Sequence, residues 1–392
     1  MKKTILITFS ILTLCSDLIP QVSTDRILSD VEKNNTTLLA FRKSIDARKT
    51  GNKTDIFLRN PEVEFGYLWG NPAVMGNRVD FSVTQSFHFP TTYGFRKQIS
   101  DLQNEQAELE YLKLLKDILL QTKLACSDLI YLNALKAEFG KRLGHARNIA
   151  ESYESGFALG ETNILDFNKS KLNLLNSEKE MELIDIQRNT LLSELEVLNG
   201  GQKIDLTDTV YEIVSVPADF EQWYLIAEMS NPVLEWLRKQ ADISQKQVKL
   251  NRAGSLPEFH TGYMSETVVA EQFRGVTAGI TIPLWENKNK IKYARANFIA
   301  SESNAGDSKL QFYNNLKSLH SKSIALQENV NNFRGNLQKL DNTVLLKKAL
   351  EAGEISLIDY MLELSIYYES VTSLLELERE LNKTVAKLKQ YE

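Results

Sequence analysis

The chain carries one structural pattern twice. Segments 61–67 and 257–263 share the pattern P-E-x-x-x-G-Y and start 196 residues apart. A second pattern, G-x-x-x-[IL]-x-D, starts at Gly160 and again at Gly353, 193 residues apart. Two different patterns in the same order and at nearly the same spacing indicate an internal duplication. We therefore expect a first repeat at 24–200, an inter-repeat segment at 201–217 and a second repeat at 218–392.

Each repeat reads as a helix, two strands, a long helix, a turn and a return helix. The seam Ala107, Tyr111, Leu114, Ile118, Thr122, Ala125, Leu129 and Leu132 steps by threes and fours, as in a coiled coil. A proline-free helix of about sixty residues would be ~90 Å long. We expect helices at 26–51, 96–155 and 164–198, with strands at 62–69 and 78–87. In the second repeat we expect helices at 220–253, broken at Asn231-Pro232, and at 288–350 and 357–388, with strands between 258 and 282.

The strands alternate between apolar and polar side chains. On one face of the first strand lie Val63, Phe65, Tyr67 and Trp69, and Tyr263 has the equivalent place in the second repeat. The opposite face carries Glu62, Glu64, Glu258 and His260. Apolar and aromatic residues facing out, with polar residues facing in, are typical of a transmembrane β-barrel. If the strands are considered apart from the long helices, their alternation fits a second structure equally well. This alternative is a small soluble hairpin that packs its apolar face on helices.

The first residues predict export. Lys2 and Lys3 precede the apolar stretch 4–14, which is too short to span a bilayer and is typical of a signal peptide. We expect a signal peptide at 1–23, with either ordinary cleavage or lipidation at Cys15. Beyond it no apolar run reaches 18 residues, so any membrane crossing has to be made by strands.

Composition excludes several classes of function. A formal net charge of −5 argues against a nucleic-acid binder, and two cysteines exclude a disulfide framework or a cysteine zinc site. The four histidines lie in different elements without ligand spacing, and no nucleotide-binding or serine-hydrolase motif occurs. We expect no enzyme activity, no cofactor and no bound metal.

The strand count requires oligomerisation if the sheet lies in a membrane. Two strands per repeat give too few to close a barrel, and open edges are not tolerated in lipid. Three chains would supply enough. The expected fold is mainly α, with two internal repeats that form, as a trimer, a 12-stranded transmembrane β-barrel continuous with a long periplasmic α-helical coiled-coil barrel.

Together these features resemble the TolC-like outer membrane efflux proteins (outer membrane factors), over essentially the whole mature chain. Segment 280–285, Ile-Thr-Ile-Pro-Leu-Trp, resembles the strand end that precedes the family's long helix, and 83–87 is its partner in the first repeat. The resemblance implies a homotrimer in the outer membrane that extends into the periplasm. It would be the passive exit duct of a tripartite efflux pump or type I secretion system. Its partners would be outer membrane lipid, a periplasmic adaptor (membrane fusion) protein and an inner-membrane RND or ABC pump.

The resemblance also assigns roles to the two turns. They would be periplasmic tips that dock the adaptor, through Gly156, Gly160, Glu161, Gly353 and Glu354. Asp166 and Asp359 would gate the entrance, and segment 202–217 would belong to an equatorial belt. The residues alone leave an alternative open, in which both aspartates support the turn by accepting hydrogen bonds from neighbouring backbone N–H groups.

The chain departs from the family where a second acidic residue and a basic residue are expected, because Leu362 and Ile355 occupy those positions. The entrance charge would therefore rest on Asp359. The sequence does not identify the transported substrate. A structural coiled-coil protein of the envelope, without a pore, remains the alternative function.

Overall fold

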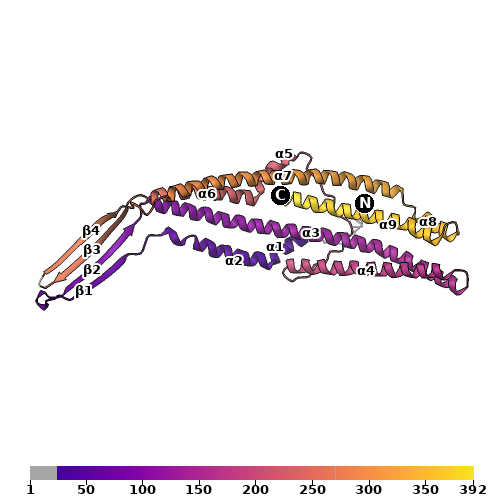
Figure 1. Cartoon of the computed structure of the whole chain (residues 1–392), viewed down its shortest axis with the longest axis horizontal. Helices are drawn as coiled ribbons and strands as arrows, with labels where there is room; N and C mark the ends of the chain where they lie inside the picture. Colours follow the sequence, from indigo (N-terminus) through magenta and orange to yellow (C-terminus); the bar gives the residue numbers. More distant parts are fainter. Residues whose placement is uncertain (1–23, 270) are drawn as a thin grey trace, which may run out of the picture. The chain divides into compact units, whose positions relative to one another are not determined.

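The computed structural model describes residues 24–269 and 271–392, so the expected signal peptide and Cys15 lie outside the described residues. The first repeat contains α1 (Thr24–Asn34), α2 (Thr36–Gly51), β1 (Glu62–Leu68), β2 (Arg78–Phe87), α3 (Thr91–Ala158) and α4 (Ile164–Leu198). The second contains α5 (Phe220–Ser230), α6 (Pro232–Ala253), β3 (Glu258–Val268), β4 (Glu271–Thr281), α7 (Lys290–Lys339), α8 (Thr343–Glu351) and α9 (Leu357–Leu388) (Figure 1). The order of elements expected from the duplication is therefore present twice.

The chain forms two compact units that do not coincide with the repeats. Among the described residues, unit 1 contains 24–33 and Ala125–Glu212, and unit 2 contains Asn34–Leu124 and Ile213–Glu392. Unit 1 holds the second part of α3 and the return helix α4. Unit 2 holds the sheet and elements of both repeats, with the sheet at one end and the turn between α8 and α9 at the other (Figure 1).

The expected single helix at 26–51 is wrong, because the chain breaks at Asn35 into α1 and α2. The Asn35 side chain accepts a hydrogen bond from the Leu38 amide at 3.0 Å, which starts a new helix. Asn231, 196 positions later, caps α6 in the same way by accepting from Val233 at 2.8 Å. Both caps are buried. The expected break at Asn231-Pro232 is thus confirmed, and its first-repeat counterpart has an asparagine cap without the proline.

We expect Asn231→Ala to lower the free energy of unfolding by about 1–2 kcal/mol, because it removes a helix cap at a buried site. Thermal or urea unfolding monitored by circular dichroism measures this loss. Asn251→Ala is the matched control, since that side chain bonds a backbone carbonyl at the surface and should cost less. Equal losses would contradict the role of the cap.

Two further boundaries differ from expectation. The expected helix at 288–350 is interrupted between Lys339 and Thr343, giving α7 and the short α8. Asp341 explains the new start, because its carboxylate accepts bonds from the amide and the hydroxyl of Thr343 at 3.1 and 2.7 Å. These bonds also hold the pKa of Asp341 below its usual value. The first strand ends at Leu68, so Trp69 lies just beyond it. The strands expected between 258 and 282 are β3 and β4, and β4 begins at Glu271.

The coiled-coil seam of α3 is confirmed by burial. Six of its members are buried to 8% exposure or less: Ala107, Ile118, Thr122, Ala125, Leu129 and Leu132. Thr122 is tolerated there because its hydroxyl donates to the Ile118 carbonyl at 2.9 Å. The seam therefore faces packed neighbours, as its spacing predicts.

The core of unit 2 is aromatic around α5. Phe220, Trp223 and Tyr224 pack with Leu316 of α7 and Leu388 of α9. Beside this cluster the buried carboxylate of Glu228 pairs with Arg238 of α6 at 3.0 Å and Lys309 of α7 at 2.7 Å. These contacts fasten the short helix α5 to its neighbours.

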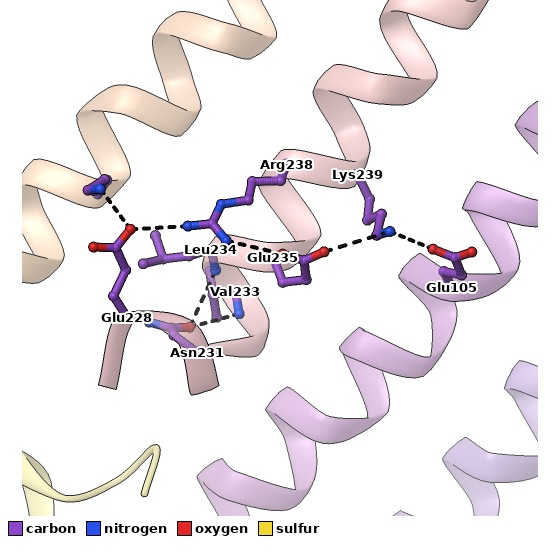
Figure 2. Close-up of polar contacts among 9 residues, drawn as sticks. Glu105, Glu228, Asn231, Val233, Leu234, Glu235, Arg238 and Lys239 are labelled. Carbon is purple, nitrogen blue, oxygen red and sulfur yellow. Dashed lines mark hydrogen bonds and ion pairs between the residues drawn. The ribbon is translucent and has the colours of Figure 1, made fainter. Parts of the chain in front are cut away.

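A row of alternating charges continues from Glu228 across α6. Arg238 also contacts Glu235, which pairs with Lys239, and Lys239 reaches Glu105 of α3 at 2.7 Å (Figure 2). These ion pairs join α6 to α3, beside the hydrogen bond that buried Gln106 of α3 donates to the Trp236 carbonyl at 3.2 Å.

A helix that crosses a bilayer needs about 20 consecutive, mostly apolar residues. No helix in the described ranges 24–269 and 271–392 has such a stretch.

Candidate functional site

The four strands form one antiparallel sheet in the order β1-β2-β3-β4. The central pairing joins the two repeats, because β2 pairs with β3 from Val79↔Thr267 to Phe87↔Phe259. Strands β1 and β4 lie at the two edges. The duplicated hairpins therefore combine into one sheet with one strand from each repeat at its edges.

The register places the expected lipid-facing residues on one face of the sheet. Directly paired residues share a face, and Val63 pairs with Val83, which pairs with Tyr263, which pairs with Val276. The large apolar side chains exposed by at least 40% on this face are Val63, Phe65, Tyr67, Phe81, Phe259, Tyr263, Val276 and Ile280. Gln272 and Arg274 of β4 are exposed polar exceptions on the same face. An exposed apolar surface of this kind marks a contact with lipid or protein.

The opposite face is mostly polar and contains charged groups that the sequence patterns did not single out. Arg78 pairs with Asp80 at 2.8 Å and with Glu266 at 3.3 Å, and Glu64 accepts from Ser82 at 3.5 Å. Met264 and Phe273 are exposed exceptions on the same face. The signal for the charged group was present in the alternation of β2, where Arg78 and Asp80 are two residues apart.

At the end of the sheet nearest the helices, Glu258 of β3 contacts the segment before β1 and the segment after β2. Its carboxylate contacts Arg59 at 3.2 Å and the Nδ1 atom of His88 at 2.7 Å. His260 lies over Gly279 of β4, so that an added Cβ there would stand 2.2 Å from the imidazole Nε2 atom. A glycine is needed at Gly279 to let the imidazole lie across the neighbouring strand.

The two turns have the same backbone structure, one in each unit. Gly160 and Gly353 take positive φ values of 76° and 74°. Glu161 and Glu354 then donate their amides five residues back, to Gly156 at 2.8 Å and Ala349 at 2.9 Å. This is the Schellman ending of a helix, and it explains why a glycine occupies each position. Gly156 has a separate reason, because its added Cβ would lie 2.7 Å from the Thr162 hydroxyl.

Each return helix starts with a cap three residues before its aspartate. Asn163 accepts from the Asp166 amide at 3.0 Å, and its own amide group donates to the Asp166 carboxylate at 2.7 Å. Ser356 and Asp359 form the reciprocal capping box. The two caps were visible in the sequence as Asn and Ser at equivalent positions. These bonds favour the turn-supporting role that the sequence left open, and the gate remains a prediction.

The surroundings of Asp166 lower the pKa of its carboxyl group, first through the hydrogen bond from Asn163 and then through Lys169. A lowered pKa stabilises the start of α4 above the unfolded value of 3.8, and this contribution disappears as the pH falls through the folded value. We therefore expect the protection factors of the amides in segment 156–167, which are corrected for the intrinsic pH dependence of exchange, to stay constant between about pH 5 and 8. A ring of close like charges would raise the pKa instead, and protection factors that change within that range would favour the gate.

Both tips expose apolar side chains before and after their glycines in the sequence. At the first tip, Leu159 and Leu165 are 73% and 67% exposed, and Phe157 stacks on Phe167 with ring centroids 5.2 Å apart. At the second tip, Val344 and Leu345 on α8 and Ile358 and Leu362 on α9 are exposed, while Leu357 and Tyr360 are buried. Leu362, where the family pattern has an acidic residue, is thus part of an exposed apolar surface.

Among the described residues, no group of three or more His, Cys, Asp or Glu side chains is placed to hold a metal ion. Cys126 is buried in α3, and burial raises the pKa of its thiol to about 12, so it is not a nucleophile at neutral pH.

Comparison with solved structures identifies the fold. The chain matches the Campylobacter jejuni CmeC outer membrane channel with 12% identity and a TM-score of 0.76, over 94% of this chain and 85% of that one. It matches the outer-membrane channel OprN with 13% identity and a TM-score of 0.79, over 94% and 89%. The outer membrane protein VceC of Vibrio cholerae matches with 13% identity and a TM-score of 0.73, over 94% of both chains. No family model and no curated protein sequence matches.

The fold is therefore that of outer membrane channel proteins. The fold expected from the resemblance to TolC-like proteins is confirmed over nearly the whole chain. These matches are described as channels or outer membrane proteins.

Proposed function

We propose that the chain is the outer-membrane exit duct of a tripartite efflux or type I secretion system, a passive conduit whose transport is driven by an inner-membrane pump. The observation that carries the proposal is the sheet, which exposes one apolar face. The outer sides of its edge strands β1 and β4 have no strand partner among the described residues. Its fold, shared with outer membrane channels, supports the same function.

Three of the four strands are long enough for a membrane crossing, whereas β1 has 7 residues. Strand β2 has 10 residues and β3 and β4 have 11 each. At about 3.3 Å per residue, ten residues extend ~33 Å, which a tilt of about 40° reduces to ~25 Å, the height of a barrel's apolar band. Phe65, Tyr67 and Tyr263 would face lipid, with Trp69 near the outer interface.

Open edges require further chains in a membrane. Strands β1 and β4 would pair with neighbouring copies, and a homotrimer would close the barrel with 12 strands. The return helix α4 supports oligomerisation independently, because its exposed apolar residues recur at helical spacing: Leu165, Leu172, Leu175, Leu183, Ile186 and Val197. Three copies would pack these stripes against one another's helices, as in a coiled-coil barrel.

The tips are proposed to dock a periplasmic adaptor protein. Gly156, Gly160, Glu161, Gly353 and Glu354 shape two tight turns, and the apolar residues around them are exposed, as a docking surface requires. Selectivity for substrate would be made upstream by an RND or ABC pump. Asp166 and Asp359 would contribute charge at the entrance only where their caps leave carboxylate oxygens accessible.

Cell fractionation separates the duct from a structural coiled-coil envelope protein. We expect the chain to remain in the outer-membrane fraction after a wash with sodium carbonate, because its strands lie in hydrocarbon. It should migrate as a heat-modifiable oligomer in unboiled gels. Release by carbonate as a monomer or a simple coiled coil would favour the alternative function.

A further inference from the structure

We infer that basic side chains at the junction of the helices and the sheet bind the phosphate headgroups of anionic phospholipids. The inference deepens the proposed function, since it states which lipid meets the periplasmic side of the sheet. We call these residues the basic collar: Lys53, Lys97, Arg252, Lys288, Lys292 and Arg295. All six are exposed.

The collar residues come from four segments that lie at the end of the sheet where the strands meet the helices. The side chain of Asn287 donates to the Gly254 carbonyl at 2.7 Å, and Asn251 donates to the Lys290 carbonyl at 3.2 Å, which joins the end of α6 to the start of α7. Arg96 at the start of α3 donates to the Asp55 carbonyl at 3.4 Å, beside Lys53. All four strands adjoin these segments on the same side of the sheet, as the register and Figure 1 show.

The collar lacks internal neutralisation. Across the part of the chain that the structure describes, ion pairs occur at many lysines and arginines, but none involves the six collar residues, whereas Glu286 nearby is taken by Lys290 at 3.6 Å. The chain as a whole is acidic, with a net charge of −5. A local excess of unpaired cations therefore stands against the overall charge and favours an anionic partner.

The start of α7 shows the same preference in another way. The amino end of a helix carries partial positive charge, so acidic residues are favourable there and basic residues are not. Helices α4 and α9 follow this rule with Asp166 and Asp359, but α7 has no acidic residue in its first turn and begins with Lys290 and Lys292. An external anion would remove this unfavourable interaction.

Aromatic and apolar groups beside the cations identify the anion as a lipid. Leu284, Trp285 and Tyr293 are 68%, 80% and 69% exposed, and they flank the lysines at the start of α7. Exposed tryptophan and tyrosine next to basic residues are typical of the membrane interface, where rings lie at headgroup level. The apolar face of the sheet begins immediately beyond, at Phe259 and Ile280. A soluble phosphate would not require this apolar surface.

Native mass spectrometry of the full-length protein in neutral detergent tests the inference. The probes are palmitoyl-oleoyl phosphatidylglycerol and phosphatidylcholine in equal amounts. One lysine at a membrane surface contributes a preference of about fivefold for anionic lipid, so we expect at least that ratio of retained phosphatidylglycerol to phosphatidylcholine. The double variant Lys288→Glu/Lys292→Glu leaves four collar residues and should lower the ratio severalfold.

The matched control is Lys317→Glu/Lys339→Glu, which makes the same change of charge farther along α7. It should keep the wild-type ratio. An unchanged ratio in the collar variant, or an equal fall in both variants, would overturn the inference, as would displacement of the lipid by inorganic phosphate at constant ionic strength. Carbonate resistance of the same proteins, measured in parallel, reports the proposed function separately, because a protein can stay in the membrane without preferring phosphatidylglycerol.

Discussion

Replacing Phe65 by lysine should reduce assembly in the outer membrane severely. Phe65 is 70% exposed on the apolar face of the edge strand β1. A lysine that faces lipid near the middle of a barrel strand costs about 2–4 kcal/mol. The measurement is the yield of heat-modifiable oligomer in the outer-membrane fraction, compared with the wild type at equal expression.

Glu64→Lys is the matched control, because it introduces the same residue one position earlier on the opposite face. Glu64 is exposed and its carboxylate accepts only a 3.5 Å bond from Ser82 among the contacts recorded for the described residues. We expect assembly near the wild-type level. Similar yields for the two variants would mean that the lipid-facing and lumen-facing sides have been assigned wrongly.

Gly353→Val should weaken adaptor docking about tenfold while the oligomer still forms. The φ value of 74° costs a β-branched residue about 1–2 kcal/mol, although an added Cβ would meet no atom within 4 Å. The strain would deform the turn between α8 and α9, whereas the buried residues Leu357 and Tyr360 keep α9 in place. A loss of this size corresponds to about tenfold weaker docking.

In-cell cross-linking through an affinity tag on this chain, followed by mass spectrometry of captured adaptor-type proteins, measures docking. Gly335→Val is the control, because Gly335 lies inside α7 with open space around its Cβ position and without a positive φ. Capture should fall for Gly353→Val and persist for Gly335→Val. Undiminished capture by an intact Gly353→Val oligomer would remove the turn from the docking surface.

The sequence predicted the features that depend on the regular spacing of apolar residues and on the internal duplication. Alternation in segments 62–68 and 78–87 determined the two faces of the sheet, and the three-and-four spacing in α3 determined its buried seam. The G-x-x-x-[IL]-x-D pattern located both turns, whose glycines have positive φ values because each ends a helix in a Schellman motif.

Features that depend on single capping bonds were missed. Asn35 and Asp341 start new helices inside stretches whose hydrophobic spacing reads as continuous, since a cap competes locally with the helix and leaves that spacing unchanged. The equivalence of Asn35 to Asn231 was available from the 196-residue spacing. The contact between Arg78 and Glu266 was not available, because it depends on the register between β2 and β3, which come from different repeats.

Conductance across a planar lipid bilayer tests the central claim most directly. The purified oligomer is added to one side, and current is recorded at a fixed voltage. If three copies close a barrel around the polar face that carries Arg78, Asp80 and Glu266, insertion should produce discrete and uniform steps of current. Bilayers that contain inserted, carbonate-resistant protein but show no steps would contradict the account of this chain as a duct.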